Sequence, residues 1–234
     1  ELVYGVLKGT EAFGNIKPSF GASINGGKKV MLQFQLDGIA KVNDEKIVQY
    51  ITLLDSNDGS SGMSVGIGNK TVSCQNQFYS FHRNAFARIR HSATLQDKLE
   101  KLPSLIEMAL LESVKMIDLY KQFTSVPITM EHYHQMSNRI IGIDNSMTKV
   151  QLKEFSTQKK NSMKSLYSCM IKETTDKGSS LWGLHSGVTR WTTHHRSAPK
   201  REHGRLESQL VGSAYRENHK SLDYCEGVFK NHVL

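Results

Sequence analysis

The spacing of the apolar residues changes near Gln77, and this change constrains the fold more than any other feature of the sequence. Before it, apolar and polar residues alternate over short runs, which is the pattern of half-buried β-strands. After it, between Leu95 and Ile117, apolar residues advance in steps of three and four, which is the pattern of an amphipathic helix. The sequence therefore predicts an α+β fold, with an N-terminal antiparallel β-meander followed by a helical half.

The meander begins with the strongest hairpin signal in the chain. Two β-prone runs, residues 19–24 and 29–36, flank Asn25-Gly26-Gly27, a sequence typical of a tight hairpin turn. Two further strands are expected at 47–54 and 63–72. We expect one apolar sheet face, because alternate residues of the second run are apolar: Val30, Leu32, Phe34 and Leu36.

The helical half is divided by proline, glycine and capping residues. We expect Pro103 to break or kink the first helical run, because proline lacks the amide proton that a helix interior needs. Thr129 is expected to cap a helix that Gly142 ends. Further helices are expected at 149–172, at 181–195 and, as one helix or a pair, at 205–229. The domain prediction is a lead-in over 1–17 and a single α+β domain over 18–234, with the meander at 18–76, a mainly helical part at 77–234 and a basic loop near 197–204.

Length and composition indicate the class of protein and the compartment in which it folds. The chain has 234 residues, enough for a sizeable core, and no apolar run approaches the roughly 18 residues of a membrane span. Its three cysteines are too far apart for a CxxC pair, which favours a reducing interior and no disulfide framework. The beginning at Glu1 has neither an initiator Met nor a signal pattern, so we expect a trimmed or partial start. A cytoplasmic protein without membrane contact is the expectation.

The formal net charge is +8, and the excess of cations is concentrated in two segments. Residues 70–91 contain four cations and no acid, and residues 182–205 contain five cations and one acid, both with aromatic residues among them. Cations neutralise phosphates and aromatic rings stack on bases, so the pattern is what a single-strand binder needs. A solvated basic surface with core aromatics beside it has the same pattern, and charge alone does not decide between the two. The candidate phosphate contacts are Lys70, Arg83, Arg88, Arg90, His91, Arg190, Arg196, Lys200, Arg201 and Arg205, and the candidate stacking rings are Tyr79, Phe81 and Trp191.

The sequence has no complete motif for nucleotide binding, metal binding or catalysis. Gly21 to Lys29 is not a P-loop, because Gly27 stands where the lysine belongs and no Ser or Thr follows to hold Mg²⁺. The histidine pairs, at 132 and 134 and at 194 and 195, have spacings unsuited to joint metal ligation. No catalytic set of Ser, His, Asp or Cys can be read. The sequence therefore predicts a protein that is not an enzyme and that has no metal and no cofactor.

Several short stretches, taken in order, resemble the motifs of a known protein family. They are Asp58-Gly59-Ser60-Ser61, Val72-Ser73-Cys74-Gln75-Asn76, Ile89-Arg90-His91-Ser92, Gly178 to Leu184, and Arg205 to Ser208 ahead of Gly212-Ser213. Over about residues 20–229 the chain resembles the phage/plasmid-like family that is labelled only as a domain of unknown function (number 932). The resemblance implies structural motif roles for Asp58, Gly59, Cys74, Asn76, Trp182 and Gly212. The chain departs from the family at Ser186, where an Asn is usual.

The family name carries no function, but its setting and the expected element order are similar to the single-strand annealing superfamily of the Redβ, Erf and eukaryotic annealing type. This likeness implies an oligomeric ring or filament that binds single-stranded DNA and anneals strands without ATP in phage or plasmid recombination. It further implies the host bacterial cytoplasm, and a phage exonuclease or a single-strand binding protein as partner.

Two other functions stay open on the sequence alone. The first is a phage structural or host-interaction protein that assembles without nucleic acid. The second is a metal-dependent nuclease that uses Asp55, Asp58 and a histidine, although Asp and Gly at these positions are also what a tight turn needs.

Overall fold

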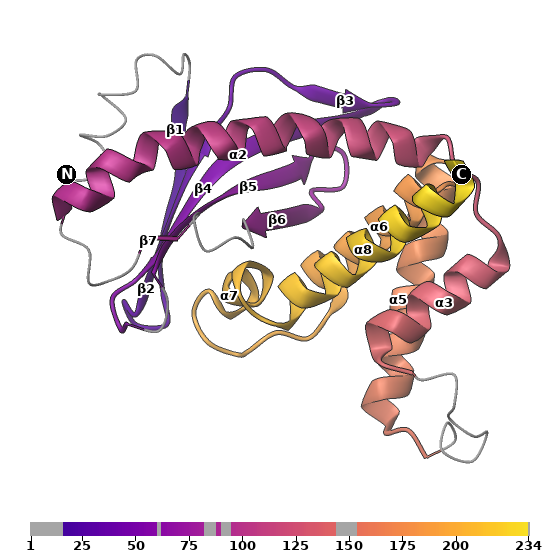
Figure 1. The fold of residues 1–234 in the computed structure, drawn as a ribbon. Helices are drawn as coiled ribbons and strands as arrows, with labels where there is room; N and C mark the ends of the chain where they lie inside the picture. The colour runs from indigo at the N-terminus through magenta and orange to yellow at the C-terminus, as the bar shows by residue number, and fades with distance from the viewer. Residues whose placement is uncertain (1–15, 60–61, 82–87, 90–94, 144–153, 234) are drawn as a thin grey trace.

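A computed structural model describes residues 16–59, 62–81, 88–89, 95–143 and 154–233. An antiparallel sheet comes first and a helical half follows, so the α+β prediction is confirmed (Figure 1). The strands are β1 (Lys17–Ile24), β2 (Lys29–Gln35), β3 (Ala40–Val42), β4 (Glu45–Ser56), β5 (Met63–Thr71), β6 (Gln77–Phe81) and β7 (Arg88–Ile89).

The predicted hairpin is the first unit of the sheet. β1 and β2 pair from Lys17 with Gln35 to Ile24 with Lys29, with a register shift between Pro18 and Phe20. Asn25, Gly26 and Gly27 all have positive φ, which is the backbone that such a turn requires. The sheet order is β1-β2-β4-β5-β6, with β3 paired to β4 and β7 paired to β5.

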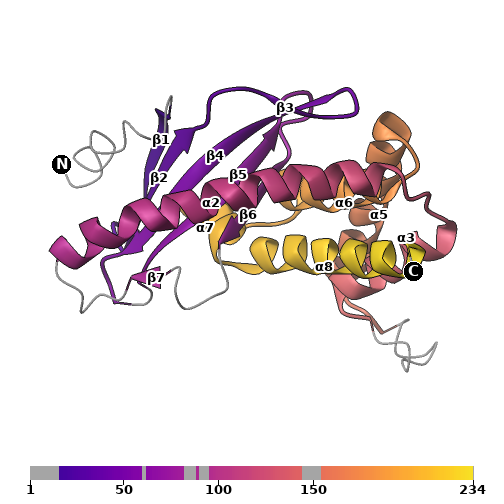
Figure 2. The same cartoon turned by 45° about the horizontal axis from the view of Figure 1, so that its top comes forward.

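The helical half contains α2 (Leu95–Thr124), α3 (Met130–Ile141), α5 (Thr157–Lys177), α6 (Leu181–Arg190), the π-helical turn η3 (Trp191–His195), α7 (Gly204–Leu210) and α8 (Ser213–Val233). Helix α2 lies across one face of the sheet. Helices α3, α5, α6 and α8 pack together beyond one end of the sheet (Figures 1 and 2). Thr129 and Gly142 cap α3 as predicted. None of the described helices is both long and apolar enough to cross a membrane.

Two sequence predictions about element boundaries were wrong. Gln77–Phe81 is strand β6, not the start of the helical half, because Phe78 packs into the main core while Tyr79 and Phe81 pack on the opposite face. Pro103 does not divide α2, which is one 30-residue helix. Leu102 and Leu105 on either side of the proline are buried, and this packing offsets the lost backbone hydrogen bond.

The sheet is apolar on both faces, which also corrects the expectation of one apolar face. One core cluster includes Ile51 and Phe34 together with residues of α2, α5 and α6. The other face carries a smaller cluster that packs against Leu210 of α7. Helix α7 is short and covers only one end of this second face. The part of the face beside α7 stays uncovered, and the candidate site lies there.

Candidate nucleic-acid groove on the open sheet face

A cavity of about 540 Å³ opens on the sheet face that points away from α2. The side chain of Gln49 donates to the carbonyl of Ser113 on α2, so the next residue, Tyr50, points to the opposite face. Strands form the floor of the cavity and α7 with the residue before it forms a wall. We call this cavity the open-face groove. It is lined by Ser19, Phe20, Gln33, Tyr50, Gly68, Asn69, Lys70, Gln77, Tyr79, His203, Arg205, Leu206 and Gln209.

The floor of the groove is built around Gly68. Strand pairing places Gly68 between Tyr50 on β4 and Tyr79 on β6. A Cβ atom at Gly68 would lie 3.1 Å from the Tyr79 ring and 3.2 Å from the Gln33 amide nitrogen. The glycine therefore lets a ring and an amide lie close across β5, which gives a shallow floor of polar and aromatic groups.

The groove is basic. Lys70, His203 and Arg205 line it, and no Asp or Glu occurs among its described lining residues. Arg205 is held in place because its guanidinium donates to the backbone carbonyls of Thr193 and Arg196, each at 3.0 Å. His203 Nε2 lies 3.6 Å from the exposed carboxylate of Glu202, so Lys70 and Arg205 are the cations of the groove lining that attract anions such as phosphate groups.

The tyrosines of the groove stay neutral at physiological pH. Burial raises the pKa of Tyr79 to about 12, and burial also raises the pKa of Tyr50. Both hydroxyls therefore keep their protons and do not add negative charge to the groove.

The groove brings together parts of both predicted basic segments. Lys70 on β5 and Arg205 on α7 are 135 positions apart in the sequence, yet they line the same cavity with Tyr79. Arg83, Arg90 and His91 lie outside the described residues, and Arg88 is placed only as backbone on β7, where it pairs with Ser64.

Three other predicted phosphate contacts already pair with carboxylates. Arg190 donates to Glu173 at 3.1 Å, and Arg196 and Arg201 form ion pairs with Glu217 and Glu207. Lys200 is exposed in the loop before α7 and does not line the groove. The segment 190–205 is thus basic mainly because its arginines hold helices together, which the sequence did not reveal.

The predicted stacking rings are buried. Tyr79, Phe81 and Trp191 are only 4%, 6% and 3% exposed, so a base has no free ring face on which to stack. Phe20 was missed, although it lines the groove and is 45% exposed. Its alternation with Ala22 and Ile24 in β1 was the available signal, because these three positions share one sheet face.

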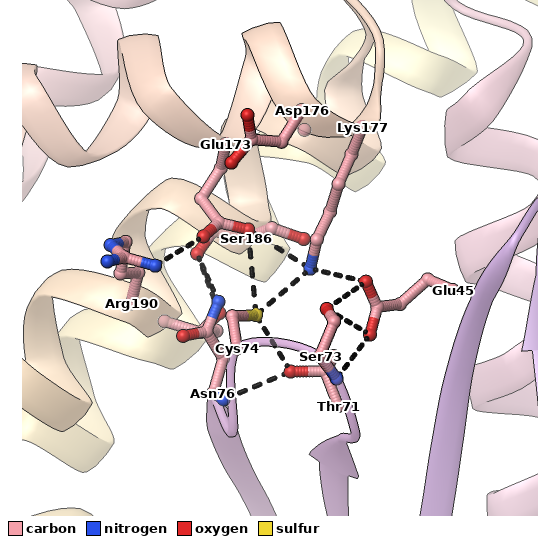
Figure 3. Close-up of polar contacts among 12 residues, drawn as sticks. Glu45, Thr71, Ser73, Cys74, Asn76, Glu173, Asp176, Lys177, Ser186 and Arg190 are labelled. Carbon is pink, nitrogen blue, oxygen red and sulfur yellow. Dashed lines mark hydrogen bonds and ion pairs between the residues drawn. The ribbon is translucent and has the colours of Figure 1, made fainter.

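The Cys74-to-Asn76 stretch of the predicted motif lies outside the groove, at a polar junction between the sheet and α5–α6 (Figure 3). Glu173 is 1% exposed at its side chain and pairs with Lys177 at 3.0 Å as well as with Arg190. Lys177 also lies 3.5 Å from the Cys74 sulfur and 3.5 Å from Glu45. Burial lowers the pKa of Lys177, but the neighbouring Glu173, Cys74 and Glu45 outweigh it, so the pKa is raised.

The other motif residues have structural positions. Asp58 accepts a hydrogen bond from the Ser56 hydroxyl at 2.9 Å, in the turn where Gly59 has positive φ. Trp182 is buried against Tyr120, with ring centroids 4.6 Å apart. A Cβ atom at Gly212 would lie 2.7 Å from the Cα of Ser208, so this position between α7 and α8 has no room for a side chain.

In the described part of the chain, no group of three or more His, Cys, Asp or Glu side chains is arranged so that it could hold a metal ion. Asp55 and Asp58, the candidate nuclease ligands, instead accept hydrogen bonds from the backbone and the hydroxyl of Ser56. These contacts stabilise the end of β4, which is the turn role that the sequence had left as an alternative.

Comparison with known proteins gives a family but no function. No curated protein and no solved structure matches the chain. One protein family matches residues 8–219, which is most of the 234-residue chain. On this match the chain belongs to the family described as Domain of unknown function (DUF932).

Proposed function

We propose that the chain binds single-stranded DNA in the open-face groove and promotes the annealing of complementary strands without nucleotide hydrolysis. The observation that carries the proposal is the convergence of Lys70, His203 and Arg205 with the exposed ring of Phe20 in one cavity whose described lining has no carboxylate. Phosphates would pair with Lys70 and Arg205, and a base would stack on Phe20.

The groove suits contacts to the sugar–phosphate backbone. Annealing requires neutralised phosphates while the base edges stay free to pair, and backbone contacts carry no sequence information. A single groove of about 540 Å³ covers few nucleotides. We therefore further propose that several copies act together along a strand, in phage or plasmid recombination in a bacterial cytoplasm, beside an exonuclease or a single-strand binding protein.

Removing the ring of Phe20 tests the site. Loss of one stacked base costs about 1–3 kcal/mol, so Phe20→Ala is expected to weaken the binding of a labelled oligonucleotide roughly 5- to 150-fold. Leu111→Ala on α2 is the matched control, because Leu111 is also an exposed apolar side chain, 58% exposed, on the helix that covers the other sheet face. Equal affinity of the two variants would remove Phe20 from the site.

A two-strand mixing experiment tests the activity. A labelled strand and its complement are combined with the protein at low and moderate salt, without ATP and with a duplex binding control. Faster pairing than in the protein-free reaction, with preference for single strands, is expected. Binding without faster pairing would contradict annealing, and no binding at low salt would remove DNA and favour a structural or host-interaction role.

A further inference from the structure

A second, much smaller cavity of about 20 Å³ lies in the interior, between the β5–β6 region of the sheet and helices α2 and α6. It shares Asn69 and Gln77 with the lining of the open-face groove, and its other polar lining residues include Asn76 just before β6, and Trp182 and His185 on α6. Of these residues, all but Gln77 are at most 5% exposed. Polar groups at such depth need hydrogen-bond partners.

Three of these side chains keep a polar atom without a hydrogen-bond partner among the described residues: Asn76 Oδ1, Trp182 Nε1 and His185 Nε2. The Asn69 amide instead faces the hydroxyl of Tyr120, which also lines the cavity. The other polar atoms of these side chains are engaged. Asn76 Nδ2 donates to the Ser186 carbonyl at 3.3 Å, and His185 Nδ1 lies 2.9 Å from the Ser221 hydroxyl. Asn69 Oδ1 accepts from Gln49 at 3.3 Å. Three unpartnered buried groups therefore belong to residues that line one cavity.

The three atoms are one donor and two acceptors. The Trp182 indole is the donor, and the Asn76 carbonyl oxygen is the first acceptor. Burial, with the nearby His219 and Lys177, lowers the pKa of His185 to about 3, so its ring is neutral. With the ring proton on Nδ1, donated to Ser221, the Nε2 atom is the second acceptor.

We propose that this cavity binds one ordered water molecule. The water oxygen accepts from Trp182, and its two protons are donated to Asn76 and His185. A water molecule can accept one hydrogen bond and donate two in so small a space, and a cavity of about 20 Å³ exceeds the roughly 10–15 Å³ that one water needs. The water connects the turn before β6 to α6, and so joins the two halves of the fold.

A crystal structure of the full chain at high resolution tests the site directly. We expect a density peak about 2.7–3.2 Å from Asn76 Oδ1, Trp182 Nε1 and His185 Nε2. A direct hydrogen bond between the Trp182 indole and the Asn76 side chain, or a cavity without density, would overturn the proposal.

A measurement in solution gives an independent result on the folded protein. In nuclear Overhauser spectra of the unmodified chain, we expect a cross-peak between the Trp182 indole proton and a long-lived water, and its disappearance in Trp182→Phe identifies the proton. The shift of the unprotonated His185 nitrogen reports an acceptor at Nε2. A protonated Nε2, or an indole proton without a water cross-peak, would contradict the assignment.

Discussion

The side-chain amide of Asn76 donates a 3.3 Å hydrogen bond to the backbone carbonyl of Ser186, 110 positions further along the chain. Next to it, His194 Nε2 lies 3.0 Å from the Cys74 carbonyl oxygen. These contacts fasten the turn between β5 and β6 to α6 and η3. The same two strands supply Lys70, Gln77 and Tyr79 to the open-face groove, so the junction fixes the floor of the groove relative to the helical half.

The buried carboxylate of Glu173 is predicted to be essential for stability. Glu173→Gln leaves Lys177 and Arg190 without their shared counter-charge in a largely buried position. Removing one member of a buried ion pair costs about 3–5 kcal/mol, and we expect this loss in the free energy of unfolding measured with urea. Asp176→Asn on the same helix removes an exposed pair with Lys172 and is expected to cost less than about 1 kcal/mol. Similar losses in the two variants would refute the role of burial.

Replacement by alanine should change the stability of the protein in opposite directions at two glycines. A Cβ atom at Gly187 would lie 2.4 Å from the Cα of Met170, so Gly187→Ala must separate α5 from α6 and is expected to cost about 3 kcal/mol. Gly227 in α8 has nothing within 4 Å of its Cβ position, and Gly227→Ala is expected to stabilise by up to about 1 kcal/mol. Thermal unfolding of both variants checks the contrast. A neutral Gly187→Ala would contradict the close approach of the helices.

His185 should make the protein less stable in acid. Its pKa is lowered from the ordinary 6.5 to about 3 in the folded chain, mainly by burial and also by His219 and Lys177. The unfolded chain therefore binds the extra proton first, so stability falls as the pH drops below 6.5 and this loss ends near pH 3. The slope from this one group is about 1.4 kcal/mol per pH unit.

Urea titrations between pH 4 and 7 measure that slope. His185→Gln is expected to reduce it by about 1.4 kcal/mol per unit. His134→Gln, at an exposed position on α3, is expected to leave it unchanged. An unchanged slope in His185→Gln would mean that His185 does not control this pH range.

Local signals in the sequence were sufficient for much of the fold. The Asn25-Gly26 turn, the alternation in β4 and β5, and the caps at Thr129 and Gly142 act within a few residues, and all of them are present. The failures came from tertiary contacts. Whether the helix continues through Pro103 depends on the sheet against which α2 packs. Strand β6 forms because it pairs with β5.

The candidate site was harder to predict from the sequence, because it too depends on tertiary contacts. The cation-rich segments led to Lys70 and Arg205, which line the groove. Nothing in the local sequence separates Arg205 from Arg190, whose carboxylate partner is 17 positions away on another helix. Likewise, exposure distinguishes Phe20 from Trp191, and exposure is a property of the packed structure.

The most direct test of the groove is the salt dependence of oligonucleotide binding by Lys70→Gln. Each phosphate contact to a single strand contributes about 0.7 to the slope of log affinity against log salt. The account predicts weaker binding with a slope shallower by about 0.7 for Lys70→Gln, and unchanged values for Lys101→Gln, an exposed lysine on α2. Equal affinity and slope in wild type and Lys70→Gln would contradict the open-face groove as the site of DNA binding.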